Sequence, residues 1–159
     1  MIAVGVVLVA IAAVLVLSRI AAISSATLGP VTLVGVDQPD ASGTACQTLM
    51  KALPDTVNDL SRRETVGDAT ASRAWGDPAV ILRCGVAPPD DLDCTVAITN
   101  VNNVWWYQQS DTDSTTYLSV DRSVHIAVTM PVGSGTGPLQ QLSDVIATTL
   151  PHQGYCKTP

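Results

Sequence analysis

The residues that could carry out hydrolytic chemistry in this chain are few. Only two histidines are present, His125 and His152, and no GxSxG motif accompanies them. Ser123, His125 and Asp121 could be drawn together as a serine triad, but triads are built from segments that are separated in sequence. His125 also falls on the outward face of a predicted strand. The sequence therefore predicts no catalytic serine site.

Aspartates form a second group that could bind a cation or act as acid and base. Asp90, Asp91 and Asp93 lie close together in one loop. Such a cluster could bind a hard cation such as Ca²⁺, and the alternative is a solvated acidic turn. Residues 111–122 begin like an EF-hand loop but lack its glycine and its final glutamate. We expect no metal site and no cofactor. An envelope hydrolase would need two carboxylates, such as Asp77 and Asp91, facing each other across a cleft.

Aromatic residues are the strongest candidates for a binding site: Trp75, Trp105, Trp106 and Tyr107. Adjacent residues on a strand point to opposite faces, so Trp105 and Trp106 cannot both lie in one core. One can fill the core, while the other is covered by a helix or loop or is left exposed. An exposed tryptophan beside Tyr107 would offer a contact site for a partner or a carbohydrate. The alternative is that all four residues serve packing alone.

Four cysteines, an even number with no CxxC motif, predict two disulfides formed in an oxidising compartment. Their spacing offers no close ligand pair for zinc. Three connectivities are possible. We expect Cys84–Cys94, which would close a short loop containing prolines, and Cys46–Cys156, which would tie the C-terminus to an early helix.

The first 26 residues contain 21 apolar residues, and Arg19 is their only charge. Such a sequence is typical of a transmembrane anchor or a signal segment. The apolar run is longer than an ordinary signal core, which favours a retained anchor, with cleavage after Ala26 as the alternative. We therefore divide the chain into an anchor or signal segment (1–26), a linker with a short strand (27–40) and an extracytoplasmic disulfide-containing domain (41–159).

Two observations concern the side of the membrane and the partners. No basic residue precedes the apolar run, and Arg19 alone would favour a cytoplasmic domain. The cysteines argue for the opposite side, and we give them more weight. Beyond residue 26 the formal charge is −7, which repels phosphate backbones and makes a nucleic-acid partner improbable.

Two helices and several strands must position these residues. Helical spacing of apolar residues runs from Cys46 to Leu53, with Pro54 either ending the helix or beginning a second turn that continues to Leu60. A second helix is predicted from Pro138 to Leu150. Strands are predicted at 31–36, 62–66, 79–84, 94–99, 104–109, 115–120 and 124–130. Because strands follow one another without helices between them, we expect an α+β fold: an antiparallel sheet with two helices packed on one face, preceded by one N-terminal transmembrane helix.

Several segments of the chain together show a resemblance to a known family. They are the run Trp75–Val86, the following Cys94, the segments Val101–Trp106 and Thr115–Tyr117, and, upstream, Cys46–Pro54 with Arg62-Arg63. Together they resemble an actinobacterial family of membrane-anchored secreted proteins, domain of unknown function 3515, over about residues 40–150. The resemblance implies a location in the cell envelope and an N-terminal membrane segment, and it implies no activity.

These observations lead to one expectation about function. We expect a single-pass protein of the cell membrane with its C-terminal domain outside the cytoplasm, or a protein secreted after cleavage near Ala26. With no catalytic motif, a protein-binding or accessory module of an envelope complex is the leading hypothesis. A small-ligand or cell-wall-glycan binding domain is the alternative, and an envelope hydrolase is the weakest of the three. A concave pocket beside Trp105 or Trp106 would distinguish among them.

Overall fold

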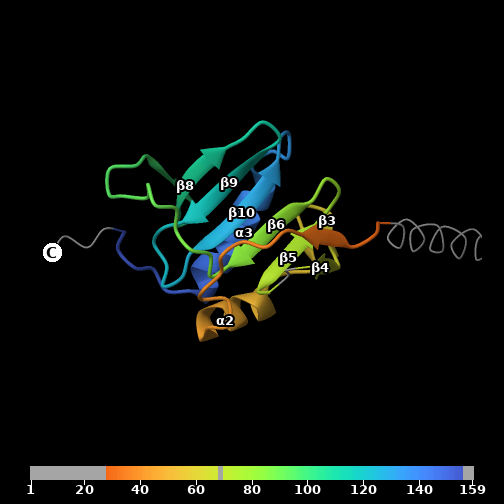
Figure 1. The fold of residues 1–159 in the computed structure, drawn as a ribbon, viewed down its shortest axis with the longest axis horizontal. Coiled ribbons are helices and arrows are strands. Elements are labelled where there is room, and N and C mark those ends of the chain that lie inside the picture. Colours follow the sequence, from red (N-terminus) through yellow and green to blue (C-terminus); the bar gives the residue numbers. More distant parts are fainter. Residues whose placement is uncertain (1–27, 68–69, 156–159) are drawn as a thin grey trace, which may run out of the picture.

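The computed structural model describes residues 28–67 and 70–155, which contain two helices and ten strands (Figure 1). The helices are α2 (Thr44–Ala52) and α3 (Gly137–Thr149). The strands are β1 (Val31–Leu33), β2 (Thr56–Val57), β3 (Leu60–Arg63), β4 (Thr65–Gly67), β5 (Ser72–Trp75), β6 (Val80–Cys84), β7 (Ile98–Val101), β8 (Val104–Ser110), β9 (Ser114–Ser119) and β10 (Ile126–Pro131).

Eight of these strands form one antiparallel sheet in the order β2-β3-β5-β6-β10-β9-β8-β7. The remaining two, β1 and β4, form a separate parallel pair. Strand β10 lies at the centre of the large sheet, between β6 and β9. Its alternating sequence buries Ile126, Val128 and Met130 on one face, as the period of a strand requires.

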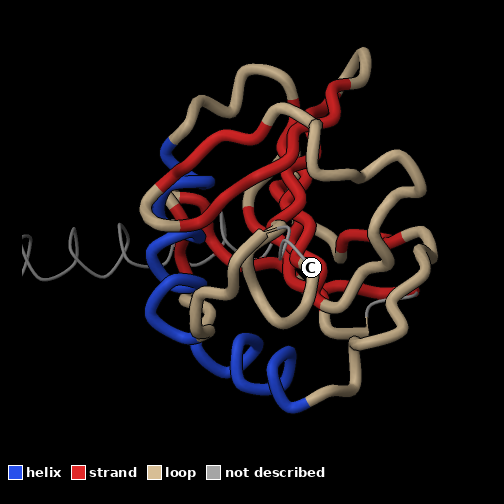
Figure 2. Tube along the Cα trace, turned by 90° about the vertical axis from the view of Figure 1, so that its left-hand side faces the viewer, coloured by secondary structure: helices blue, strands red, loops and turns tan. Residues whose placement is uncertain are grey.

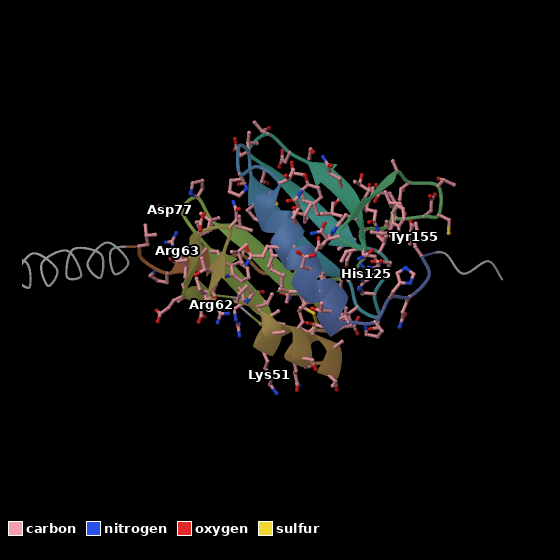
Figure 3. All side chains as sticks on the ribbon, turned by 180° about the vertical axis from the view of Figure 1, so that it is seen from behind. Lys51, Arg62, Arg63, Asp77, His125 and Tyr155 are labelled. Atoms are coloured by element: carbon pink, nitrogen blue, oxygen red, sulfur yellow. A yellow bond between two sulfur atoms is a disulfide. The ribbon has the colours of Figure 1, made fainter. Side chains whose placement is uncertain are left out.

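Helix α3 covers that face of the sheet, as the view from behind shows (Figure 3). Its apolar stripe, Leu139, Leu142 and Ile146, is buried in the same cluster as the inward residues of β10. Each such side chain contributes about 1.5–3 kcal/mol by leaving water. In the view from the end, α3 lies on one side of the strands and α2 lies below them (Figure 2).

The opposite face of β5 and β6 is crossed by residues 28–40, which pass in front of the sheet in Figure 1. Several hydrogen bonds hold this segment: Arg83 donates to the carbonyl of Val34 at 3.1 Å, and Gln38 donates to that of Cys84 at 2.9 Å. At Gly85 the approach is so close that a Cβ atom would lie 2.5 Å from the backbone of the segment. Gly85 also has φ +81°, so a residue without a side chain is needed there.

A disulfide joins α2 to the end of β6 through Cys46 and Cys84, whose Cα atoms lie 5.6 Å apart. The expected pairs Cys84–Cys94 and Cys46–Cys156 are therefore wrong. Both half-cystines are buried, because the packing of α2 beside β6 places them together across 38 residues of sequence. Loop length alone could not reveal this contact. Cys94 is disulfide-bonded as well, and Cys156 lies outside the described residues.

The expected fold class also needs correction. The described chain is a sheet-rich fold with an eight-stranded antiparallel sheet and two helices. Only α3 lies across the sheet face, while α2 sits at its margin against α3. Within residues 28–67 and 70–155 no helix has the length and apolar character needed to cross a bilayer. The transmembrane helix expected over residues 1–26 lies outside the described residues.

The strands between Pro54 and Trp75 account for much of the difference. A second helical turn through Val57 and Leu60 was one expectation, yet the structure has a hairpin of β2 and β3 there. Asn58 and Asp59, at its turn, have φ of 46° and 66°, which Asn and Asp tolerate better than most residues. Two residues of left-handed backbone are incompatible with a continuing helix, so the chain reverses.

Candidate functional site

The four aromatic candidates do not form one site. Trp75 and Trp106 are fully buried, and each indole N–H has an internal acceptor. Trp75 donates to the carbonyl of Pro54 at 3.1 Å, and Trp106 donates to the hydroxyl of Ser143 on α3 at 3.1 Å. These two residues are structural, because a buried indole needs an acceptor and both have one.

Trp105 is different, because its side chain lies on the other face of β8 and is 37% exposed. It lines a cavity of about 520 Å³ together with Asn100, Asn103, Arg122 and His152. The volume falls within the range of small-molecule sites. Tyr107 lies farther along β8, where its hydroxyl donates to Asp91 at 3.3 Å. The concave surface beside Trp105 is therefore the candidate site, and we call it the Trp105 pocket.

The hairpin of β7 and β8 positions one wall of the pocket. Asn100 lies directly opposite Trp105 in the register of the two strands. Asn102 and Asn103 form the turn, with φ of 47° and 64°. Positive φ at both central residues gives the turn that matches the twist of a hairpin, and Asn favours it. Asn102 donates to the carbonyl of Gln140 on α3 at 3.2 Å, which fixes the turn against the helix.

The base of the pocket rests on a buried ion pair. Asp121 is 0% exposed, and its Oδ2 accepts a hydrogen bond from Arg122 at 2.6 Å. The same guanidinium donates to the carbonyls of Asp121 and Asn103, at 3.0 and 2.7 Å. Asp121 Oδ1 and Arg122 Nε have no hydrogen-bond partner in the described part of the chain. The pair thus cancels its own charge and ties the start of β8 to the segment after β9.

The end of α3, with Ala147 and Thr148, and the segment that follows it form the other wall. Leu150 ends the helix ahead of Pro151, and His152 then lies with its Nε2 3.7 Å from Asp121 Oδ2. The side chain of His152 is 59% exposed. The backbone N–H of Gln153 donates to the carbonyl of Asp121 at 2.8 Å. His152 thus contacts the buried ion pair at the base of the pocket through Asp121.

The residues of the serine triad are not assembled. His125 Nδ1 lies 2.8 Å from the carbonyl oxygen of Ser119, while Asp121 pairs with Arg122. The two carboxylates considered for a hydrolase are also separately engaged. Asp77 lies 3.5 Å from Arg63, and Asp91 accepts the hydrogen bond of Tyr107.

The acidic loop is held by its own hydrogen bonds. Asp93 Oδ1 accepts from the backbone and the hydroxyl of Thr95, both at 2.7 Å, and these bonds lower the pKa of Asp93. The hydroxyl of Tyr155 donates to the carbonyl of Asp93. Burial, followed by the charges of Asp93 and Tyr107, raises the pKa of Tyr155. No group of three potential ligands that could hold a metal occurs in the described residues.

A larger cavity, of about 850 Å³, lies near the start of the described chain and is lined by Arg62 and Arg63. Both guanidinium groups donate hydrogen bonds to backbone carbonyls of the protein. Arg62 donates to the carbonyls of Leu53 and Pro54 at the end of α2, and Arg63 donates to Gly76 and Gly29. Figure 3 shows Arg63 and Asp77 together at this end. We regard these arginines as structural clamps, and the Trp105 pocket remains the stronger candidate.

Sequence reasoning did not find Asn100, Asn103 and Arg122 as site residues. Two signals in the sequence could have identified them. Adjacent asparagines between apolar stretches indicate a hairpin turn, which would have placed Asn100 across from Trp105. The charged pair Asp121-Arg122 interrupts a largely apolar stretch between two predicted strands, which indicates charges that are paired with each other.

Comparison with known families identifies the family of this chain. A family described as "Protein of unknown function (DUF3515)" matches residues 4–155, so the chain belongs to that family. The resemblance noted from the sequence to domain of unknown function 3515 is confirmed. No curated protein and no solved structure gives a significant match to the chain.

Proposed function

We propose that this protein is a non-catalytic binding domain of the cell envelope whose contact site is the Trp105 pocket. The observation that carries the proposal is the exposure of Trp105 at a concave surface while Trp75 and Trp106 are buried. Large aromatic residues that remain accessible dominate the energy of many binding sites. The small size of the pocket favours a small ligand or a glycan over a flat protein surface.

A location outside the cytoplasm is part of the same proposal. The apolar sequence of residues 1–26 would hold the domain at the membrane or direct its secretion after cleavage near Ala26. The disulfide between Cys46 and Cys84 supports an oxidising compartment, because cytoplasmic thiols are normally kept reduced.

The arrangement of the two ends suits this location. The first described residues and the last ones lie at opposite ends of the molecule (Figure 1). Tyr155 is found at the end away from Arg63 in Figure 3. His152, which lines the pocket, is three residues from Tyr155. A domain attached through its N-terminal side would therefore present the Trp105 pocket away from the membrane.

A second candidate function is binding of another envelope protein as an accessory subunit. Strand β7 favours it, because it is the last strand in the sheet order and pairs only with β8 among the described residues. A free strand edge can accept an extended segment of a partner through backbone hydrogen bonds. The partner strand would lie beside Asn100 at the edge of the Trp105 pocket.

A photo-reactive residue placed at position 105 of the full-length protein would test the proposed function. After illumination of intact cells, we expect a crosslinked envelope component that is absent when the same residue replaces Val132. Val132 is a suitable control because it is 69% exposed and lies outside the pocket lining. Mass spectrometry would identify the product as a glycan or a protein. Equal capture at both positions would overturn the assignment of the site.

A further inference from the structure

We infer that the Trp105 pocket takes a neutral sugar ring and discriminates against anionic ligands. This inference rests on the proposed function, since it names the class of ligand for that same pocket. Three properties of the pocket support it: the cancelled charge at its base, the accessible indole on its wall and the uncommitted amides on its rim.

The charge of the base is cancelled within the protein. Arg122 is the permanent cation of the pocket, and its two terminal nitrogens already donate to Asp121 and to the carbonyl of Asn103. A guanidinium binds a carboxylate or phosphate strongly when it can present two parallel N–H groups. Here Nη1 and Nη2 donate within the protein, Nε is buried, and the side chain is 2% exposed, so the guanidinium does not present such a fork to an anion in the pocket.

The remaining charges near the pocket do not favour an anion either. His152 Nε2 lies 3.7 Å from the Oδ2 atom of Asp121, and the imidazole carries a charge only when it is protonated. Asp121, Arg122 and His152 together carry at most one positive charge. The whole chain has a formal charge of −6, which opposes the approach of anions.

The indole and the amides provide what a sugar requires. Trp105 offers an accessible apolar ring against which the C–H face of a sugar can pack. The side chains of Asn100 and Asn103 are exposed, and neither amide makes a hydrogen bond to the protein within the described residues. A primary amide both donates and accepts, which matches the hydroxyl groups of a sugar. Asn102, by contrast, is engaged with α3.

Titration of the full-length protein, solubilised in detergent, with three trisaccharides would test the inference. Cellotriose and chitotriose are neutral, and trigalacturonate is the acidic counterpart of similar size. Isothermal calorimetry and tryptophan fluorescence would follow binding. We expect a neutral trisaccharide to bind at least tenfold more tightly than trigalacturonate, with an affinity that is unchanged between low and high salt because no ion pair forms.

Variants would connect the signal to the pocket. Trp105→Ala should weaken binding about tenfold or more, and Trp105→Phe should retain part of the affinity because the ring is kept. Asn100→Ala should weaken it roughly two- to tenfold, the loss expected for one hydrogen bond. Asn58→Ala, in the β2–β3 turn, is the matched control and should bind as the parent does. Thermal unfolding would verify that each variant is folded.

Three outcomes would overturn the inference, and they affect the proposed function differently. Tighter and salt-sensitive binding of trigalacturonate through Trp105 would overturn the inference and leave the proposed function standing. Absence of binding by all three sugars would also overturn the inference, and crosslinking at position 105 would then decide the proposed function independently. Neutral-sugar binding that survives Trp105→Ala would overturn the inference, because the sugar would be bound elsewhere.

Discussion

Asp121 and Arg122 are charged side chains in the protein interior, where burial of a charge is energetically unfavourable. Both are buried, and the loss of hydration of each ion costs several kcal/mol. The short contact between them, and the two carbonyls that Arg122 also reaches, offset that cost. Because the pair joins the start of β8 to the segment after β9, it holds the base of the Trp105 pocket in shape.

The first prediction concerns removal of one partner of this pair. Arg122→Ala should lower the free energy of unfolding by about 3–5 kcal/mol, because Asp121 would be left buried and unpaired. Urea denaturation measures the change. Asp144→Asn, an exposed residue of α3, is the control and should alter stability by less than about 0.5 kcal/mol. A loss of under about 1 kcal/mol in Arg122→Ala would contradict the structural role of the pair.

The second prediction concerns pH. Because the pKa of Tyr155 is raised by burial and by Asp93 and Tyr107, the fold favours the neutral phenol. The stability that Tyr155 contributes is therefore complete below pH about 10 and is lost as the pH rises through its higher folded-state pKa. Phenolate absorbance should show one late-titrating tyrosine, absent in Tyr155→Phe. If that substitution removed a step at or below the ordinary tyrosine pKa, the contact with Asp93 would be incorrect.

Among the elements, periodicity predicted those with long, regular patterns. Both helices and the central strand β10 were found near their expected positions, since apolar residues recur there with a clear period. Strand β1 lies within the expected strand 31–36, and the expected strand 62–66 is divided between β3 and β4. Strands β2 and β5, which are two and four residues long, were not predicted, and neither was the parallel pairing of β1 with β4. Such short strands show little periodicity in the sequence. Whether they form depends on their pairing with other strands.

The third prediction concerns the disulfide between α2 and β6. Replacing Cys46 and Cys84 together by alanine should lower the free energy of unfolding by up to roughly 4 kcal/mol, the entropy of a closed loop of this length. Chemical denaturation measures the loss, and peptide mapping without reduction should recover the two cysteines in one linked product. Recovery of Cys84 linked to Cys94 would contradict the arrangement of α2.

The fourth prediction concerns the β2–β3 hairpin. Asp59 has φ 66°, so Asp59→Val should lower the free energy of unfolding by about 1–2 kcal/mol. Asp59→Gly, which accepts this backbone without strain, should be neutral or slightly stabilising. Thermal denaturation of the two variants compares them directly. Equal stability of the two would show that the chain does not reverse at this residue.

For the whole molecule, the candidate site could be predicted only in part. The alternation of side chains on a strand indicated that one of the two adjacent tryptophans would leave the core, and Trp105 does so. The other walls of the pocket come from β7 and the β7–β8 turn, the segment after β9, and the end of α3 with the segment after it. Their meeting depends on the order of strands in the sheet, which local sequence patterns do not contain. The same dependence explains the wrong disulfide pairs.

The order of the strands also determines where the two ends of the described chain lie. Residues 28–40 are bound across one face of the sheet near β5 and β6, whereas the chain after α3 reaches the opposite end (Figure 1). The two ends of the described chain are thereby separated along the long axis of the molecule (Figure 1). We propose that this separation lets a domain held at a membrane bind a glycan on the far side.

The indole N–H signals in a two-dimensional nitrogen–proton NMR spectrum test the central claim most directly. Three tryptophans give three signals, and Trp75 and Trp106 are held by Pro54 and Ser143. On addition of cellotriose or chitotriose, we predict that the signal lost in Trp105→Phe moves while the other two stay in place. A Trp105 signal that is unmoved by either sugar, or a shift confined to the buried pair, would contradict the account.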